Sequence, residues 1–309
     1  MNPTLNPLPG TGDMASARPS ALLNRLTRLS KDNRYDVFTR FDWPDALPAD
    51  QYWLPPELLS VHGTVWFDQL SEAGRMRLSQ TETAILFSVF AKGEVDLLQA
   101  VLARIHKPGL DDCRDYFHHF IDEENKHMWF FSEFCRRYTN GLYPIKKLSF
   151  FSASLSAWEG FLGFARIMIF EEIGDYFNTN VMKDLRVPAI LRTLHQVHHE
   201  DESRHLAMGQ EVARRLFQAI CAGLPEENLR AVWRYLEGYM QWSIENFYNP
   251  SAYADAGMED AYGIRIALLA SPARKERHGQ ILARVRDFLG KLFGESITGQ
   301  EDFRSEGAY

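Results

Sequence analysis

Two Glu-x-x-His units constrain this chain more than any other feature of its sequence. The first unit joins Glu124 to His127, and the second joins Glu202 to His205. In a helix, residues three positions apart lie about 60° from each other and one turn apart, so both side chains can bind one metal ion. One such unit arises easily by chance. Two units on separate long helices match dinuclear metal sites in four-helix bundles, which take one further Glu from each remaining helix.

Helical periodicity and its breaks predict the elements that would carry these units. We place four long helices, with two further helices packed around them, at residues 79–106, 110–139, 149–183, 188–222, 225–247 and 273–294. Pro and Gly residues mark the breaks between the first four helices. No segment shows sustained alternation of apolar and polar residues with β-branched enrichment, which disfavours sheets. The predicted fold class is all-α, with a ferritin-like four-helix bundle core and additional flanking helices.

The beginning of the chain differs in composition from the rest. Residues 1–20 are rich in Pro, Gly and Ser and lack the charged start and apolar core of a signal peptide, so we predict a disordered tail. We expect one domain over residues 21–309, because the candidate ligands must converge on one point. The most apolar long stretch, 149–170, is interrupted by Glu159 and Arg166, which argues against a membrane span.

Charge and cysteine content exclude several classes of function. The formal net charge is -7 and no run of Lys and Arg stands out, so nucleic acid is not an expected partner. The three cysteines, Cys113, Cys135 and Cys221, are odd in number and widely spaced. They form neither a disulfide framework nor a CxxC metal site, and they fit a reducing cytoplasm.

The helical faces that carry the two units support a buried site. Apart from His127, the residues that share the face of Glu124 are apolar: Cys113, Phe117, Phe120, Phe131 and Cys135. His198 lies four residues before Glu202 and falls on its face, so it can supply a further ligand. His195, one turn away from His198, is either a hydrogen-bond partner of a ligand or an ordinary core histidine.

Each remaining helix must supply one Glu. On the first helix only Glu94 shares a face with apolar residues, whereas on the third helix both Glu171 and Glu172 have apolar neighbours one turn away. Periodicity leaves the third-helix ligand open.

Four carboxylates would neutralise two divalent cations, and without metal they would be like charges in one core. Oxygen and nitrogen ligands without a thiolate favour iron or manganese over structural zinc.

From about Trp53 to beyond His205 the chain resembles the p-aminobenzoate N-oxygenases, the AurF-like di-iron proteins. The most specific part is the block EEIGDYFNTNVMKDLRVPAILRTLHQVHHEDESRH, in which a Glu pair, a Pro and His-x-x-x-Glu-x-x-His follow in the family's order. The resemblance implies that Glu171 is the third-helix ligand and that Glu172 is its neighbour. The metal ligands that it implies are Glu94, Glu124, His127, Glu171, His198, Glu202 and His205.

The resemblance also implies an activity. It implies a cytoplasmic homodimer with two iron ions (Fe²⁺/Fe³⁺), dioxygen as co-substrate and an external electron donor, either a reductase or a ferredoxin. The reaction would oxidise a small-molecule amine to a hydroxylamine, nitroso or nitro product, in secondary metabolism. A benzoate-like substrate would want a cation in the pocket, yet the helix of Glu94 offers only Lys92, off the metal face. Aliphatic amines, amino acids and oximes therefore stay open.

Three alternatives remain at this point. A di-iron hydroxylase or desaturase would act on carbon with the same ligands. A ferritin-like iron-handling protein would oxidise and store iron without an organic substrate. The metal centre itself could be di-iron or a mixed manganese and iron pair.

Overall fold

The structure is a computed structural model that describes residues 20–145 and 153–298. Within these ranges all regular secondary structure is helical, which confirms the predicted all-α class. Of the predicted tail only Ser20 is described, and the rest lies outside the described residues. The Ser20 hydroxyl accepts a hydrogen bond from the Leu23 N–H at 3.2 Å and so caps helix α1 (Ala21–Asp32), which the sequence analysis did not predict.

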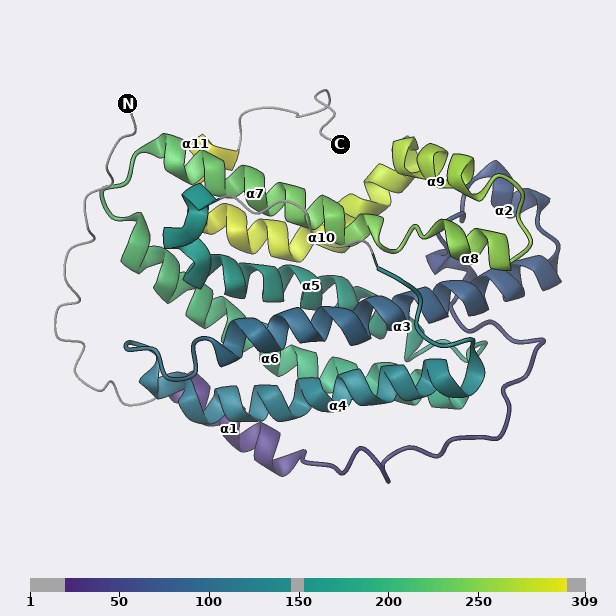
Figure 1. The fold of residues 1–309 in the computed structure, drawn as a ribbon, viewed down its shortest axis with the longest axis horizontal. Helices are drawn as coiled ribbons and strands as arrows, with labels where there is room; N and C mark the ends of the chain where they lie inside the picture. Colours follow the sequence, from purple (N-terminus) through teal and green to yellow (C-terminus); the bar gives the residue numbers. More distant parts are fainter. Residues whose placement is uncertain (1–19, 146–152, 299–309) are drawn as a thin grey trace.

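Four long helices form the centre of the molecule: α3 (Glu72–Leu102), α4 (Arg114–Tyr138), α5 (Glu159–Val181) and α6 (Ala189–Cys221). Figure 1 shows them running side by side. Helix α3 packs along α4, and α5 packs along α6. Further contacts join α3 to α5 and α4 to α6, so that each helix has two neighbours. This is the predicted four-helix bundle.

The bounds of these helices differ from the predicted ones where local signals were overlooked. Helix α3 begins at Glu72, before the predicted residue 79, because the Ser71 hydroxyl accepts a hydrogen bond from the Gly74 N–H at 3.2 Å. The predicted start of the third helix at residue 149 lies outside the described residues. The described chain then forms a 3-10 helix (Ala153–Trp158) before α5. The sequence stays apolar through this turn, so hydrophobicity did not mark the boundary between the 3-10 helix and α5.

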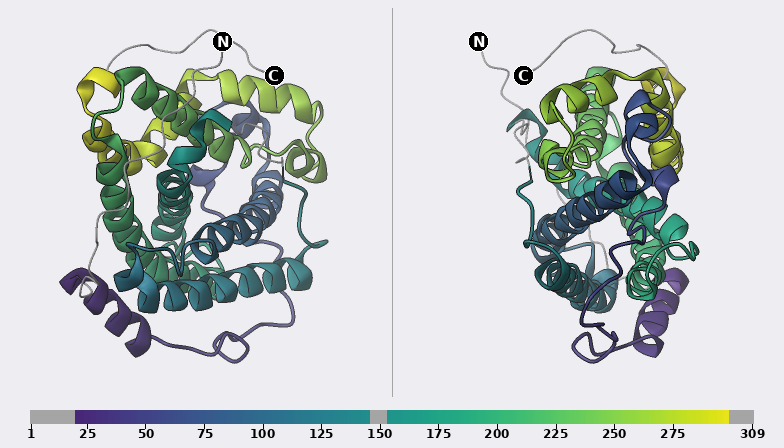
Figure 2. Two further views of the ribbon diagram at one scale, coloured as in Figure 1. Left: turned by 60° about the vertical axis from the view of Figure 1, so that its left-hand side comes forward. Right: turned by 90° about the vertical axis from the view of Figure 1, so that its right-hand side faces the viewer.

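Flanking helices cover the bundle. Helices α7 (Glu226–Glu245) and α10 (Pro272–Phe293) pack on α5, close to the predicted bounds, and α1 packs on α4 and α6. Figure 2 shows this layer of α7 and α10 on one side and α1 on the other. The remaining short helices are η1 (Pro56–Leu58), α2 (Val65–Gln69), η2 (Asp111–Cys113), α8 (Pro250–Asp255), α9 (Ala261–Ala270) and α11 (Glu295–Thr298).

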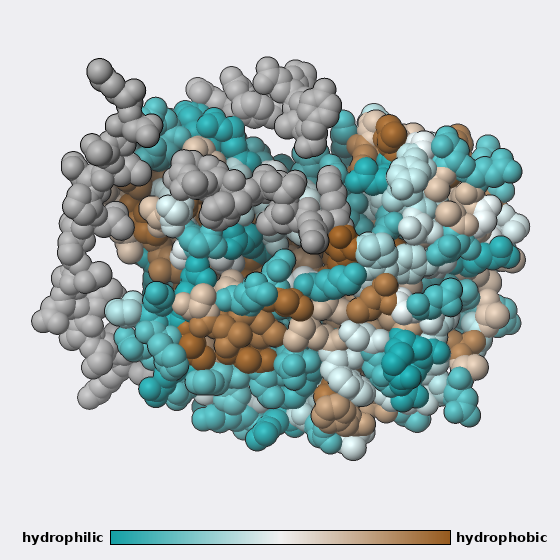
Figure 3. Space-filling view, viewed as in Figure 1, coloured by the Kyte–Doolittle hydropathy of each residue, from teal (hydrophilic) through white to brown (hydrophobic). Residues whose placement is uncertain are grey.

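Helix α5 shows why its apolar sequence is not a membrane span. Its residues are buried on nearly every side, as expected of a helix that is apolar all round and lies inside a protein. The charge of Arg166 is satisfied by Glu159, whose carboxylate lies 2.6 Å from the guanidinium. Among the described helices, none combines the length and apolarity that crossing a membrane requires. The face in Figure 3 is mixed, with hydrophilic regions and apolar patches. On α3 the apolar residues Val95 and Leu102 are exposed.

Candidate metal centre

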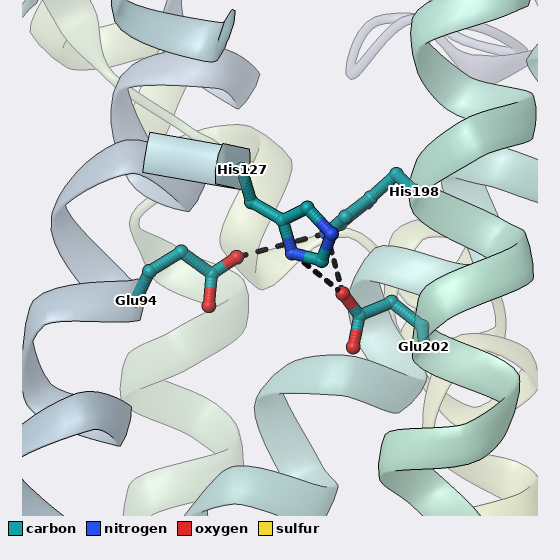
Figure 4. Close-up of side chains that lie close together, drawn as sticks. All are labelled: Glu94, His127, His198 and Glu202. Atoms are coloured by element: carbon teal, nitrogen blue, oxygen red, sulfur yellow. Dashed lines mark ion pairs between the residues drawn. The ribbon is translucent and has the colours of Figure 1, made fainter. Parts of the chain in front are cut away.

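The side chains that the sequence analysis singled out as ligands converge inside the bundle. All of them are at most 1% exposed. Three groups of them bring their ligand atoms within 4.8 Å of one another: Glu124, His127, Glu202 and His205; Glu94, His127, His198 and Glu202; and Glu94, Glu124 and Glu171. Figure 4 shows the second group, with side chains from α3, α4 and α6 pointing toward one another.

The two Glu-x-x-His units face each other across the bundle. Within each unit the His Nδ1 lies 3.0 Å from its own Glu, as helical spacing predicts: His127 to Glu124, and His205 to Glu202. The same nitrogens also face the opposite helix. His127 Nδ1 is 3.1 Å from Glu202 Oε1, and His205 Nδ1 is 2.9 Å from Glu124 Oε1. Each Nδ1 therefore points at a place shared by two carboxylates.

His198 joins this cluster from the next turn of α6. Its Nε2 lies 2.9 Å from Glu202 Oε1 and 3.6 Å from Glu94 Oε1. On the far side of the ring, the Oδ1 of Asn178 is 3.2 Å from His198 Nδ1 and 2.7 Å from His195 Nδ1. The Asn178 Nδ2 lies still closer to His198 Nδ1, at 2.8 Å, so one amide contacts both rings. His195 thus contacts Asn178 and not a candidate ligand directly.

The structure separates the two adjacent glutamates on α5. The Glu171 carboxylate lies in the cluster with Glu94 and Glu124. Glu172 points elsewhere, because successive helical residues are rotated by about 100°. Its Oε2 lies 3.3 Å from Arg284 Nε on α10, and burial raises the pKa of Glu172 to about 6. Glu172 therefore faces Arg284 and not the cluster.

Two carboxylates that the sequence analysis missed hold the outer nitrogens of the paired histidines. His127 Nε2 lies 3.1 Å from Asp201 Oδ2 on α6, and His205 Nε2 lies 2.9 Å from Glu123 Oε2 on α4. Each carboxylate accepts the outer N–H, so the inner Nδ1 is left free to bind a metal. The available signal was an acidic residue directly before the Glu of each Glu-x-x-His unit. It resembled ordinary surface charge on a helix.

A buried cation connects these two carboxylates. Arg204 contacts Asp201, and its Nη2 donates to Glu123 Oε1 at 2.7 Å. Its Nε donates to the Ser30 hydroxyl on α1 at 3.0 Å. Because one guanidinium serves both carboxylates, it ties the two sides of the site together. Arg204 lies inside the second Glu-x-x-His unit, yet its partners are far away in sequence, so periodicity did not reveal its role.

The charges of the cluster fit divalent cations. Both carboxylate oxygens of Glu94 and of Glu171 are buried and accept no hydrogen bond from the described residues. Burial, followed by the negative charges around them, raises the pKa of both groups well above the usual range. The pKa of Glu202 is held well below its usual value despite burial, because His205 and His198 lie beside it. Two cations would supply the missing partners.

A comparison with known protein families identifies the family to which this chain belongs. A family model described as P-aminobenzoate N-oxygenase AurF matches residues 16–292. The chain belongs to the AurF family. The resemblance in the sequence is thereby confirmed, and the protein is a non-haem oxidoreductase of the di-iron, ferritin-like class. No curated protein sequence matches the chain.

Solved structures with a similar arrangement are R2-like ligand-binding oxidases. One, with an aerobically reconstituted Mn/Fe cofactor, has a TM-score of 0.45 at 10% identity, and the match covers 85% of this chain and 92% of that chain. Another, without metal cofactor, has a TM-score of 0.44 at 15% identity, and the match covers 86% of this chain and 98% of that chain.

Proposed function

We propose that this AurF-family protein is a di-iron, dioxygen-dependent N-oxygenase that converts an amine into a hydroxylamine, nitroso or nitro product. The main observation that supports the proposal is a third imidazole at the cluster, that of His198. His198 faces the same carboxylates as the two Glu-x-x-His units, with its Nε2 at 2.9 Å from Glu202. A site with three imidazoles matches the ligand pattern that the family block predicts, including its extra His.

We assign the metal ligands as four carboxylates and three imidazoles: Glu94, Glu124, His127, Glu171, His198, Glu202 and His205. The assignment is supported by their burial, by the short distances between their ligand atoms and by the unpartnered oxygens of Glu94 and Glu171. Oxygen and nitrogen donors suit iron, and also manganese. We propose two iron ions, and metal analysis distinguishes them from a mixed pair.

When bound, the two iron ions would supply electrons to dioxygen and the oxidising equivalents for the amine nitrogen. The surrounding protein excludes water from the place where this occurs. Phe131 and Phe90 lie against the His198 ring with centroids 4.9 and 5.3 Å away, and Phe120 lies 4.4 Å from His205. In such a dry site, Asp201 and Glu123 keep the two histidines in one orientation.

The reaction also sets requirements on partners. Oxidation of an amine to a hydroxylamine with dioxygen forms one water and consumes two electrons and two protons, so the enzyme needs an external electron donor. We propose a reductase or a ferredoxin for this role. We further propose a cytoplasmic homodimer acting in a biosynthetic pathway. The exposed apolar residues Val95 and Leu102 on α3 offer one surface for the contact between subunits.

We propose that Lys92 is not the cation that would hold a benzoate-like substrate. The Lys92 ammonium donates to the backbone oxygen of Tyr143 at 2.5 Å and is thereby engaged outside the cluster. We therefore propose that the test compounds include aliphatic amines, amino acids and oximes as well as aryl amines.

The direct test loads the purified protein with Fe²⁺, reduces it, and mixes it with these amines and isotopically labelled dioxygen. Mass spectrometry should show label on nitrogen in at least one product. Glu202→Gln, which alters a carboxylate found in two of the three ligand groups, should abolish the product, while Glu172→Gln should retain it. Labelled oxygen found only on carbon would reject the N-oxygenase in favour of a hydroxylase. Iron deposition by a large hollow oligomer would indicate iron storage instead.

A further inference from the structure

One of the two outer carboxylates is connected to the protein surface. The Tyr35 hydroxyl donates a hydrogen bond to Asp201 Oδ2 at 3.3 Å, although the two residues are 166 positions apart. The same oxygen lies 3.1 Å from His127 Nε2. Tyr35, Asp201 and His127 therefore form a continuous line of hydrogen-bonded side chains that ends in the metal cluster.

The outer end of this line lies in a hollow on the surface. The hollow has a volume of about 770 Å³ and is lined by the segment around Tyr35 and by one face of α4. Tyr35 is half-buried at this place, and Lys126 Nζ lies 4.7 Å from the centre of its ring. Next to it, the rings of Phe38 and Trp129 meet edge to face at 5.0 Å. The phenol thus has one side toward the solvent and its hydroxyl toward the site.

The equivalent position on the other side of the site is different. Glu123 contacts the Arg204 guanidinium, which leads to the Ser30 hydroxyl and not to an aromatic ring. Tyr116 is fully buried on that side, and its hydroxyl has no hydrogen-bond partner among the described residues. Among the described side chains, only the line through Asp201 therefore joins a phenol in the hollow to a candidate ligand.

We infer that Tyr35 is the point at which electrons enter the metal site. The inference rests on the proposed function, which requires two electrons from an external one-electron carrier such as a reduced iron–sulfur protein. Each transfer oxidises one carrier and delivers one electron through Tyr35, Asp201 and His127. No bond is made or broken in these side chains, because the phenol keeps its proton and the electron passes to the ferric ion. Hydrogen-bonded contacts couple these groups more strongly than open gaps would.

The test measures reduction and not amine oxidation. The protein is loaded with iron, oxidised, and mixed without oxygen with reduced methyl viologen, while the ferric absorbance is followed by stopped flow. Tyr35→Phe keeps the ring and removes the hydroxyl, and it should slow reduction about tenfold or more, because an open gap then replaces the hydrogen-bonded contact to Asp201. Tyr116→Phe removes a buried hydroxyl near His205 and should reduce at the wild-type rate. Tyr35→Trp, whose ring N–H can donate to Asp201, should recover much of the rate.

Metal content and thermal midpoint separate a relay from a merely structural contact. In Tyr35→Phe the metal content should be unchanged if the inference is correct, and the thermal midpoint should fall only by what the loss of one partly buried hydrogen bond costs. A wild-type rate of reduction in Tyr35→Phe would overturn it. Loss of iron from this variant, or equal slowing in Tyr116→Phe, would also overturn it, because the hydroxyl would then only hold the site in place. A wild-type protein that is reduced normally but oxidises no amine would reject the proposed function alone.

Discussion

At the scale of single residues, the site depends on which atom each side chain presents to its centre. The outer carboxylates Asp201 and Glu123 accept from the Nε2 atoms of His127 and His205, so both Nδ1 atoms face inward. On α5 the choice between two adjacent glutamates is decided by one rotation of about 100° along the helix. The sequence could not decide it, because both positions have apolar neighbours and the partner of Glu172 is on a distant helix.

The pair Glu171 and Glu172 provides a matched test of the ligand assignment. Glutamine keeps the size of glutamate and removes its charge. Glu171→Gln should lower the metal content from about two ions per chain to about one, because it removes a carboxylate from the cluster. Glu172→Gln should keep both ions, because this carboxylate faces Arg284. Elemental analysis of the purified variants gives the answer, and metal loss in Glu172→Gln alone would reverse the assignment.

A second buried carboxylate on α3 makes stability depend on pH. Glu82 accepts hydrogen bonds from the Ser60 N–H at 3.0 Å and from its hydroxyl at 2.5 Å. Burial raises the pKa of Glu82 from 4.5 to about 7. A carboxyl whose pKa is higher in the folded state contributes stability below its unfolded pKa, and this is lost as the pH rises through the folded value.

The contribution of Glu82 should therefore fall by about 3 kcal/mol as the pH rises from about 4.5 to about 7. In Glu82→Gln this dependence is absent, because glutamine does not titrate. The measurement is the free energy of unfolding by denaturant for both proteins across this pH range. A difference between them that does not change with pH would contradict the assigned pKa.

At the scale of elements, two central helices approach closely beside the metal cluster. A Cβ atom on Gly93 of α3 would lie 2.1 Å from Cζ of Phe170 on α5. The ring therefore rests directly on the α3 backbone, next to Glu94 on one helix and Glu171 on the other. Any side chain at this position would therefore force the Phe170 ring to shift.

Gly93→Ala should destabilise the protein by about 1–3 kcal/mol, as expected for overpacking in a well-packed core. It should also weaken metal binding, because Phe170 and its helix must shift. Gly279→Ala on α10 is the control, since nothing lies within 4 Å of its added Cβ. This change should stabilise the protein by about 0.5–1 kcal/mol, because alanine favours the helix. Thermal unfolding should show a lower midpoint than wild type for Gly93→Ala and a higher midpoint for Gly279→Ala.

Periodicity predicted the long helices well, because each has a continuous apolar face or, in the case of α5, is apolar nearly all round. It could not predict their close approaches. Gly93 looks in the sequence like an unfavourable helical residue, and only the neighbouring helix explains it. The short helices α1, α8 and α9 were missed for a related reason. They are 12, 6 and 10 residues long, and such lengths give too little periodic signal to separate them from the surrounding irregular chain.

At the scale of the whole molecule, segments far apart in the sequence complete the site. Ser30 and Tyr35 precede the bundle, yet they contact Arg204 and Asp201 across 174 and 166 positions. One sequence contains no signal that pairs such distant residues. Its ligand pattern does define the inner part of the cluster, because that pattern repeats at helical spacing. The outer part, including Asn178, Glu123 and Asp201, becomes visible only when the helices are assembled.

Metal removal tests how far this assembly depends on its cations. Without the cations, burial raises the pKa values of Glu94 and Glu171. Burial alone would lower the pKa values of His127 and His205, but the neighbouring carboxylates have the larger effect and raise them. Groups with raised pKa values in the folded state stabilise it when protonated, so the metal-free protein should lose stability as the pH rises. The metal-loaded protein should not, because the cations replace those protons.

The gap in thermal midpoint between loaded and metal-free protein should therefore widen from about pH 5 to about pH 8. With free metal at about 100 times its Kd, the loaded form should be more stable by about 3 kcal/mol. Loading should also release protons, which calorimetry detects as a heat that depends on the ionisation enthalpy of the buffer. Glu172→Gln serves as the control and should show the same widening, because the Glu172 carboxylate faces Arg284 and not the cluster. A gap that stays constant with pH would mean that the cluster holds no cations in exchange for its protons.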